Sequence, residues 1–303
     1  MLPRYVAGGF LLPLTGYYAD TYGWADKLLP WAYGAGIVAG ELYSMLAVFA
    51  LGPVLVLFLN SVKTSEQIAQ NPFSIPAEPR WDNYTVAYER GNYATTVKNS
   101  AILTGGTVIG VLIVGGMGGY ALAHLEIRGA NAIAFYFLVG TAIPIQLYVV
   151  PLFFIWKTFG LLNTHLGLII IYCATSSPFA TYLIRSYMVA LPKEFIEAAK
   201  IDGASKFQVM TQVILPLSWP GFLTTGLIVG LGVWNEFLIA VTFMHQPELK
   251  PVATSLRAFQ ERFTRDWGLT NAASVIMLLP VLILFLLMQR RFIEGLTQGG
   301  MKM

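Results

Sequence analysis

Six apolar stretches long enough to cross a lipid bilayer dominate this chain. A transmembrane helix needs about 20 residues, because each residue adds about 1.5 Å along the helix axis. Only helices and closed barrels satisfy their backbone hydrogen bonds in lipid, and these stretches lack the alternation of barrel strands. The sequence therefore predicts an all-α integral membrane protein with six transmembrane helices. They are expected at residues 42–60, 99–123, 131–156, 165–189, 218–243 and 270–289.

The composition supports this class and excludes others. Hydrophobic residues make up 56% of the chain and charged residues 12%, with a mean hydropathy of +0.62, outside the range of soluble domains. The net charge is +3 and no run of Lys or Arg exceeds two residues, so nucleic-acid binding is not indicated. A single cysteine excludes an intramolecular disulfide, and the scattered histidines show no metal-ligand spacing.

A polar hairpin at residues 190–217 separates the fourth and fifth apolar stretches. Pro192 fits the first position of a helix that runs to about residue 201. Glu194 and Glu197 place negative charge near the start of this helix, where the helix dipole favours it. Gly203 supplies the left-handed turn that ends the helix. The pattern predicts a short helix-turn-helix outside the lipid.

The second helix of the polar hairpin is predicted to start near Ser205. Phe207, Met210 and then Val213 or Ile214 recur every three to four residues, which predicts one apolar face. Two interpretations fit this pattern. The hairpin either lies on the membrane surface or presents a short helix to the groove of a partner protein.

Three other segments lie outside the apolar stretches. Residues 1–40 form a partly apolar extension with a poor signal-cleavage site, and no role is assigned to them. Whether residues 28–60 make one long helix, or an interfacial helix and a span, is left open. Prolines through residues 61–98 argue against a helix and favour an extended, solvated segment. Residues 244–269 mix charged and aromatic side chains and are long enough to hold a partner.

Several motifs together resemble a known transporter family over most of the chain, from about residue 44 to the end. Glu197-Ala198-Ala199 is followed after three residues by Gly203, and after nine more by Val213-Ile214-Leu215-Pro216. This is similar to the Glu-Ala-Ala loop of permease subunits in binding-protein-dependent ATP-binding-cassette importers. Asp202 matches the sugar-importing branch, and Val213 replaces the usual isoleucine. Further matching motifs are Asn99-Ser100, Gly119-Tyr120-Ala121-Leu122-Ala123, Gly160-Leu161-Leu162-Asn163-Thr164, Trp234-Asn235-Glu236-Phe237, Asp266-Trp267-Gly268, Gln289-Arg290-Arg291-Phe292 and Gly295-Leu296-Thr297.

The combination looks like the carbohydrate permeases of the maltose-G-like type. This resemblance implies a type I importer permease domain at residues 41–303, with the polar hairpin as a cytoplasmic coupling helix and external loops at 61–98 and 244–269. It places both termini in the cytoplasm of a bacterial or archaeal cell, with the chain in the cytoplasmic membrane. The 19 Lys and Arg residues divide almost equally between the two sides, so the orientation depends on the resemblance alone.

The resemblance also implies the partners: a second permease subunit, two copies of a cytoplasmic ATPase and an extracytoplasmic sugar-binding protein. No Gly-Lys dipeptide occurs in the chain, so a Walker A loop is absent. We therefore expect a non-enzymatic subunit without a cofactor, with ATP and Mg²⁺ bound by the partner ATPases. The expected ATPase-coupling residues are Glu197, Ala198, Ala199, Asp202, Gly203, Phe207, Met210, Leu215 and Pro216. The expected binding-protein docking residues are Lys250, Phe259 and Trp267.

Polar side chains inside two apolar stretches mark a candidate substrate path. Trp234, Asn235 and Glu236 lie in the fifth stretch, and Gln146 and Tyr148 lie in the third. An ionisable group within a span costs about 2.5–3.5 kcal/mol on insertion scales, so Glu236 is expected to avoid lipid. Aromatic faces and amide or carboxylate groups suit sugar rings and hydroxyls. An interhelical hydrogen bond that only fixes packing is the simpler explanation of Glu236, and sugar contact is the alternative.

Three alternatives differ in function. A polyol phosphate such as glycerol 3-phosphate is imported by related permeases. An ion-driven secondary transporter would require paired intramembrane carboxylates, for which only Glu41 and Glu236 are candidates. A membrane-bound enzyme would require a nucleophile, base or metal constellation, and the sequence shows none.

Overall fold

The computed structural model describes residues 25–262 and 266–300, with side chains at 41–256, 259 and 266–289. These residues form helices and no strand. The longer elements are α2 (Ala25–Ser61), α5 (Tyr93–His124), α8 (His165–Val189), α12 (Trp219–Trp234) and α15 (Trp267–Gly300). The shorter ones are α3 (Ser65–Gln70), α4 (Asp82–Arg90), α6 (Ala130–Gly140), η1 (Ile145–Leu147), α7 (Val149–Thr158), α9 (Lys193–Ile201), α10 (Lys206–Gln208), η2 (Val209–Ile214), α11 (Leu215–Leu217), α13 (Leu238–Phe243), η3 (Pro247–Leu249) and α14 (Val252–Arg262).

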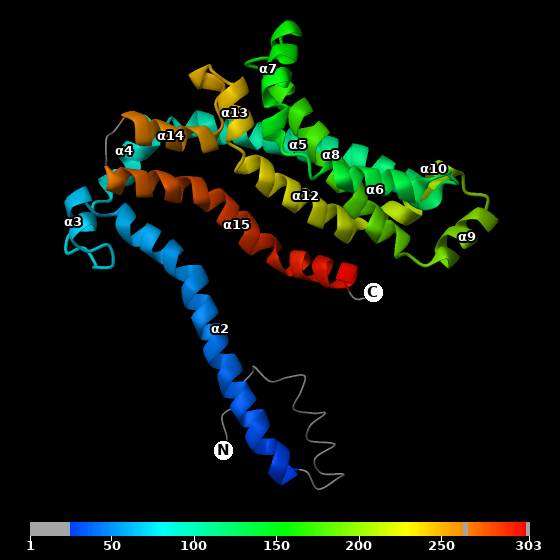
Figure 1. Cartoon of the computed structure of the whole chain (residues 1–303), viewed down its shortest axis with the longest axis horizontal. Helices are drawn as coiled ribbons and strands as arrows, with labels where there is room; N and C mark the ends of the chain where they lie inside the picture. Colours follow the sequence, from blue (N-terminus) through cyan, green and yellow to red (C-terminus); the bar gives the residue numbers. More distant parts are fainter. Residues whose placement is uncertain (1–24, 263–265, 301–303) are drawn as a thin grey trace.

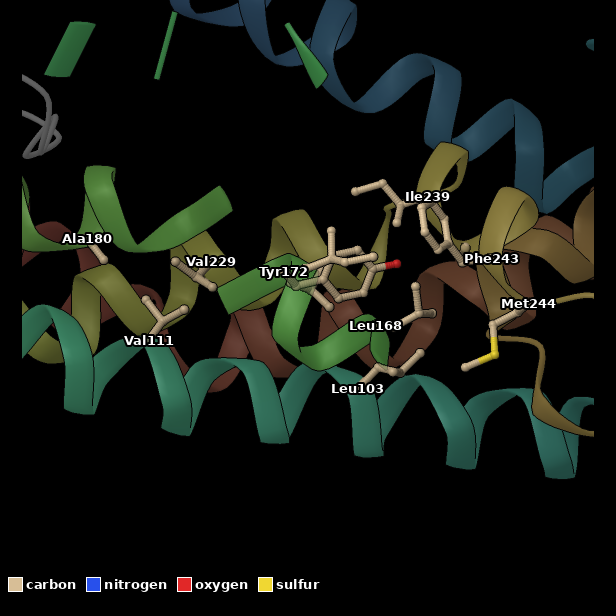
Figure 2. Packing of buried hydrophobic residues seen from close by; sticks show 12 residues of the cluster. Leu103, Val111, Leu168, Tyr172, Ala180, Val229, Ile239, Phe243 and Met244 are labelled. Carbon is tan, nitrogen blue, oxygen red and sulfur yellow. The ribbon is translucent and has the colours of Figure 1, made fainter. Parts of the chain in front are cut away.

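Helices α5, α8 and α12 pack together and form the centre of the bundle (Figure 1). Glycines on α5 let α8 approach closely. A Cβ at Gly115 would lie 3.2 Å from the Ala180 Cβ, and a Cβ at Gly119 would lie 3.1 Å from the Arg185 backbone nitrogen. Figure 2 shows the apolar side chains of this centre, which are Leu103 and Val111 from α5, Leu168, Tyr172 and Ala180 from α8, Val229 from α12, and Ile239, Phe243 and Met244 from α13 and its end.

Four of the described helices are long and apolar enough to cross a membrane, at residues 41–61, 93–124, 165–189 and 267–289. A fifth span results if Lys206–Leu217 and Trp219–Trp234, which meet at 72°, are taken together. The prediction of one helix over residues 131–156 is wrong, because α6 and α7 are separated at residues 141–148. Pro144 explains the break, since it lacks an N–H and has an extended ψ of 131°. The stretch at 218–243 is also divided, at residues 235–237.

Helix α2 is continuous from Ala25 to Ser61, which answers the question left open by the sequence. The expected boundary between residues 40 and 41 therefore falls inside a helix, and residues 1–24 lie outside the described residues. Helix α2 packs against α15 and leans away from the rest of the bundle towards its own start (Figure 1). Most of its apolar side chains from residue 41 onwards are exposed, including Phe49 at 82%.

The segment at residues 61–98 is folded, so the prediction of an extended and solvated loop is wrong for most of it. Helices α3 and α4 and the start of α5 occupy most of it, and the longest part without a helix is the proline-rich stretch at 71–81. Asn83 on α4 is buried and donates from Nδ2 to the carbonyls of Ser61, at 2.9 Å, and Lys63, at 3.1 Å. Lys63 Nζ donates to the carbonyls of Asn71 and Pro72. Burial lowers the pKa of the Lys63 ammonium.

Candidate functional site

The first helix of the polar hairpin ends as its glycine predicts. Gly203 has a φ of +80°, its N–H bonds to the Lys200 carbonyl, and the Ala204 N–H bonds back to the Ala199 carbonyl at 2.9 Å. These two bonds define a Schellman motif, in which a left-handed residue terminates a helix. The prediction for Pro192 is wrong by one residue: Pro192 precedes the first helical residue, with an extended ψ of 133°.

The second half of the polar hairpin begins with a capping box. Ser205 Oγ accepts the Gln208 N–H, and the Gln208 side chain accepts the Ser205 N–H. The chain then winds as a π-helix, η2, from Val209 to Ile214. Hydrogen bonds in a π-helix span five residues, so Val209 and Ile214 face the same way, and both are buried. The predicted single apolar face is therefore divided, because Ile214 is buried against the bundle whereas Phe207 is 72% exposed.

The buried face of the polar hairpin is anchored to the bundle. Its side chains at Ile196, Val209 and Ile214 share a cluster with α5, α8 and α12. Tyr120, at the end of α5, donates its hydroxyl to the Lys206 carbonyl at 2.9 Å. The cluster members on the bundle side are Tyr120, Ile184, Met188 and Phe222. The polar hairpin is therefore packed directly onto these helices.

The exposed side of the polar hairpin carries charged residues and two large apolar side chains that the described chain does not cover. Ile201 is 86% exposed and Phe207 is 72% exposed, on either side of the Gly203 turn. Glu197 is also exposed, and it forms no ion pair or hydrogen bond within the described residues. Of the remaining expected coupling residues, Met210, Leu215 and Ala199 are half-buried and Ala198, Asp202 and Pro216 are exposed.

The region around residues 244–252 is fixed by two motifs from other parts of the chain. Asn99 on α5 is buried and donates from Nδ2 to the carbonyls of Glu248, at 2.8 Å, and Lys250, at 3.1 Å. Asn163 has a left-handed φ of 56°, and its Oδ1 accepts the N–H groups of His245 and Gln246. These motifs therefore set the shape of the segment between the fifth and sixth apolar stretches.

The expected docking residues in this segment have different environments. Phe259 on α14 is only 2% exposed, and its ring lies 6.5 Å from that of Tyr93. The expectation that Phe259 contacts a binding protein is therefore wrong, because this chain already covers the side chain. Trp267 is 54% exposed and Lys250 is half-buried.

A cavity of about 390 Å³ opens between η1, α8, α12, α13 and the connection that follows α6. Tyr148 and Glu236, two of the expected path residues, line it together. The other three do not: Trp234 Nε1 donates to the Met277 carbonyl on α15, Asn235 caps its own helix, and Gln146 is exposed outside the lining. The cavity is lined by Thr141, Ile143, Ile145, Tyr148, Tyr172, Thr175, Ser176, Phe179, Ile228, Val229, Gly232, Val233, Glu236 and Ile239.

Glu236 is held by three hydrogen bonds at the break between α12 and α13. Its Oε2 accepts the Tyr172 hydroxyl at 2.8 Å and the Ala240 N–H at 3.0 Å. Its Oε1 accepts the Ile239 N–H at 2.8 Å. The carboxylate thereby caps the start of α13 and ties it to α8. The packing role considered for Glu236 is present, and the side chain faces the cavity as well.

Sequence reasoning missed the contribution of α8 to this cavity. Tyr172, which Figure 2 shows among the packed side chains of the bundle, lines the cavity, and Thr175, Ser176 and Phe179 follow it along the same helix. The polar run from Thr175 to Ser177, just before Pro178 and inside an apolar stretch, was the signal that could have found it. Within the described residues, no three side chains of His, Cys, Asp or Glu are grouped as a metal site.

Comparison with known proteins assigns this arrangement to a family. Residues 113–297, which include the polar hairpin and most of the cavity, match the family of binding-protein-dependent transport system inner membrane components. The chain belongs to this family. It is therefore a multi-pass inner membrane component of a transport system.

Relatives of this inner membrane component match along most of its length. The diacetylchitobiose uptake system permease protein NgcG of Streptomyces coelicolor is 33% identical, covering 86% of this chain and 87% of that protein. The arabinooligosaccharides transport system permease protein AraQ of Halalkalibacterium halodurans is 30% identical, covering 86% and 94%. A chain from the crystal structure of a bacterial importer of the acidic polysaccharide alginate is 25% identical, with a TM-score of 0.72, covering 85% and 96%.

Proposed function

We propose that this chain is one of two permease subunits of an ATP-driven importer, and that the pair forms the path for a sugar delivered by an external binding protein. Membership of the binding-protein-dependent family supports a binding-protein partner. Relatives named as permeases for diacetylchitobiose and arabino-oligosaccharides support a mono- or oligosaccharide as the substrate. The family match argues against an ion-driven transporter.

Two exposed apolar side chains of the polar hairpin carry the proposal for ATPase coupling. Ile201 and Phe207 are large apolar side chains on a short, firmly anchored segment outside the lipid. Such a helix fits the groove of a partner protein, and aromatic anchors contribute most of the binding energy at such contacts. Two cytoplasmic ATPase subunits would each take one polar hairpin, and they would bind ATP and Mg²⁺. This chain performs no chemical step itself.

Coupling then follows from the anchoring of the polar hairpin. Closure of the ATPases on ATP would displace the two polar hairpins. Tyr120 and the buried cluster beneath would transmit this displacement to α5, α8 and α12 as a rigid-body movement. The helices lining the cavity would thereby alternate between states open to either side. This places the polar hairpin and both termini in the cytoplasm, and residues 244–252 outside.

Phe207→Ala is expected to weaken the association between the permease pair and the ATPase about 30-fold. Loss of an aromatic anchor at an interface costs about 2 kcal/mol. The isolated permease should be unaffected, because Phe207 is exposed in the single chain. Co-purification of the ATP-hydrolysing subunit at increasing salt and dilution measures the change.

Phe73→Ala is the matched control for Phe207→Ala. Phe73 has the same 72% exposure but lies in the proline-rich segment after α3, outside the polar hairpin. It should leave ATPase association unchanged. Equal retention of the ATPase by the Phe207→Ala and wild-type proteins would show that the polar hairpin is an ordinary surface loop.

A photo-crosslinking residue in place of Glu248 is expected to capture the sugar-binding protein during turnover. Glu248 is exposed, and its carbonyl is held by Asn99, so the probe occupies a defined place. The same probe in place of Lys200, which is exposed on α9, should capture the ATPase instead. Mass spectrometry identifies the partner captured by each probe. Capture of the ATPase from Glu248 and of the binding protein from Lys200 would show the opposite orientation in the membrane.

A further inference from the structure

In the described part of the chain, the side chains that line the 390 Å³ cavity include an acidic group but no basic group. Among the described residues that line it, Glu236 is the one charged side chain, and no Lys, Arg or His is present. Hydroxyl groups from Thr141, Tyr148, Thr175 and Ser176 supply neutral hydrogen-bonding partners. The remaining surface is apolar or aromatic. An uncharged, polyhydroxylated solute finds partners on this wall, whereas a phosphate, sulfonate or uronate finds no cation.

Three hydrogen bonds reach the carboxyl oxygens of Glu236, and its partners donate all of them. The Tyr172 hydroxyl and the N–H groups of Ile239 and Ala240 all donate to its two oxygens. A carboxylate oxygen accepts hydrogen bonds and donates none, so this arrangement suits a carboxylate. No lysine or arginine pairs with Glu236 among the described residues, so its negative charge is not neutralised. The described lining therefore contains one acidic side chain and no cation beside it.

We infer that Glu236 is a specificity-determining residue, which makes this part of the path select uncharged sugars and reject anionic ones. The inference rests on the proposed function and names its substrate class. The names of relatives do not decide this point, because diacetylchitobiose is uncharged and alginate is acidic. Glycerol 3-phosphate and other polyol phosphates, open on the sequence alone, are rejected by this charge.

The physical basis is repulsion between two like charges at the cavity wall. In a protein environment the interaction of unit charges a few ångströms apart is several times stronger than in water. Building an unpaired like charge into a site is also a common way to exclude a competing ligand. The rejection requires only the charge of Glu236, while the capping of α13 requires its hydrogen bonds. Variants can separate these two roles.

The local charge in the cavity can be measured from the labelling rates of a cysteine introduced into its lining. Ser176→Cys is introduced in a Cys173→Ala background, so that the assembled importer carries one thiol from this chain. The thiol is treated with two methanethiosulfonates of similar size, one with a neutral hydroxyethyl group and one with an anionic sulfonatoethyl group. The labelling rate of the neutral reagent is divided by that of the anionic reagent, and this ratio is corrected by the same ratio for free cysteine. The corrected ratio reports the local charge. We expect the anionic reagent to be about tenfold slower.

Two further variants distinguish charge from architecture. Glu236→Gln removes the charge and keeps the size of the side chain, and it should bring the corrected ratio close to one. Tyr172→Phe removes a hydrogen bond to Glu236 but keeps the charge, and it should retain most of the tenfold difference. This pattern would support the inference.

Three outcomes would overturn the inference. The first is a corrected rate ratio of one in the Ser176→Cys protein that retains Glu236. The second is a corrected ratio that falls equally towards one in Glu236→Gln and in Tyr172→Phe. The third is failure of the neutral reagent to label Ser176→Cys at all, which would mean that the cavity is closed in the assembled importer. None of them bears on ATPase association through Phe207. Failure of this inference and failure of the proposed function are therefore told apart.

Discussion

Replacing Gly203 with valine is expected to abolish sugar uptake while leaving the protein in the membrane. Gly203 has a φ of +80°, and a Cβ there would meet no atom within 4 Å, so the cost comes from the backbone alone. A left-handed conformation costs an ordinary residue about 1–2 kcal/mol, and a β-branched residue more. The turn is therefore expected to change conformation and to move Phe207 away from the ATPase. Uptake of labelled sugar and the amount of membrane-inserted protein measure the two effects.

Gly129 offers a matched control for this backbone strain. It also has a left-handed φ, of +78°, and a Cβ added there would meet no atom within 4 Å, but it precedes α6 and lies outside the polar hairpin. Gly129→Val should retain ATPase association. Gly203→Asn should retain part of the uptake, because asparagine tolerates this conformation better than valine. Normal uptake by Gly203→Val, with normal ATPase co-purification, would contradict a coupling role for the turn.

The turn at Gly203 shows which features local rules can predict. A glycine after an amphipathic stretch, followed by a serine cap, specifies a helix end and a helix start within a few residues, and both are present. The winding of the next segment could not be predicted this way. Its π-helix buries Val209 and Ile214 against the bundle, and Tyr120 binds the Lys206 carbonyl from another helix. A helical period of 3.6 residues groups Phe207 with Ile214 on one face, whereas in the structure Ile214 is buried and Phe207 is exposed.

The interrupted spans have a similar explanation. Hydropathy identified apolar stretches at 131–156 and 218–243, but an average over 20 residues does not register a single break. Pro144 divides the first stretch, and capping by Glu236 divides the second. These breaks create the cavity wall, because Tyr148 and Glu236 both lie at them. The sequence thus indicated two residues of the candidate path and missed the partners from α8 that complete it.

The segment at residues 244–269 shows what composition cannot predict. Its charged and aromatic residues indicated a surface for a partner, but composition does not say which side chains face outward. Helix α14 turns Phe259 inward against Tyr93, whose hydroxyl donates to the Ala273 carbonyl on α15. Trp267 faces outward at the start of α15. The distinction depends on contacts between residues about 170 positions apart, which no local pattern contains.

Gly268→Ala is expected to destabilise the permease by about 3 kcal/mol. A Cβ at Gly268 would overlap the backbone carbonyl oxygen of Lys63. That oxygen cannot move freely, because it accepts a hydrogen bond from the buried Asn83 side chain. Overpacking against backbone that cannot relax costs about 1–3 kcal/mol, and loss of this hydrogen bond would add about 1 kcal/mol. The start of α15 should separate from the end of α2, and the thermal unfolding midpoint of the purified permease pair should fall.

Gly226→Ala tests whether the expected loss comes from this contact or from glycine replacement in general. Gly226 also lies in a helix, but its added Cβ would meet only Val108 and Leu112 side-chain atoms at 3.4 and 3.5 Å, which is ordinary contact. Alanine is the better helix former by about 1 kcal/mol, so Gly226→Ala should leave the unfolding midpoint unchanged or raise it. The Asp266-Trp267-Gly268 motif then acts through backbone packing between α15 and α2. A Gly268→Ala protein that unfolds at the same temperature as Gly226→Ala would remove that explanation, because the close approach at Lys63 would not be needed for the fold.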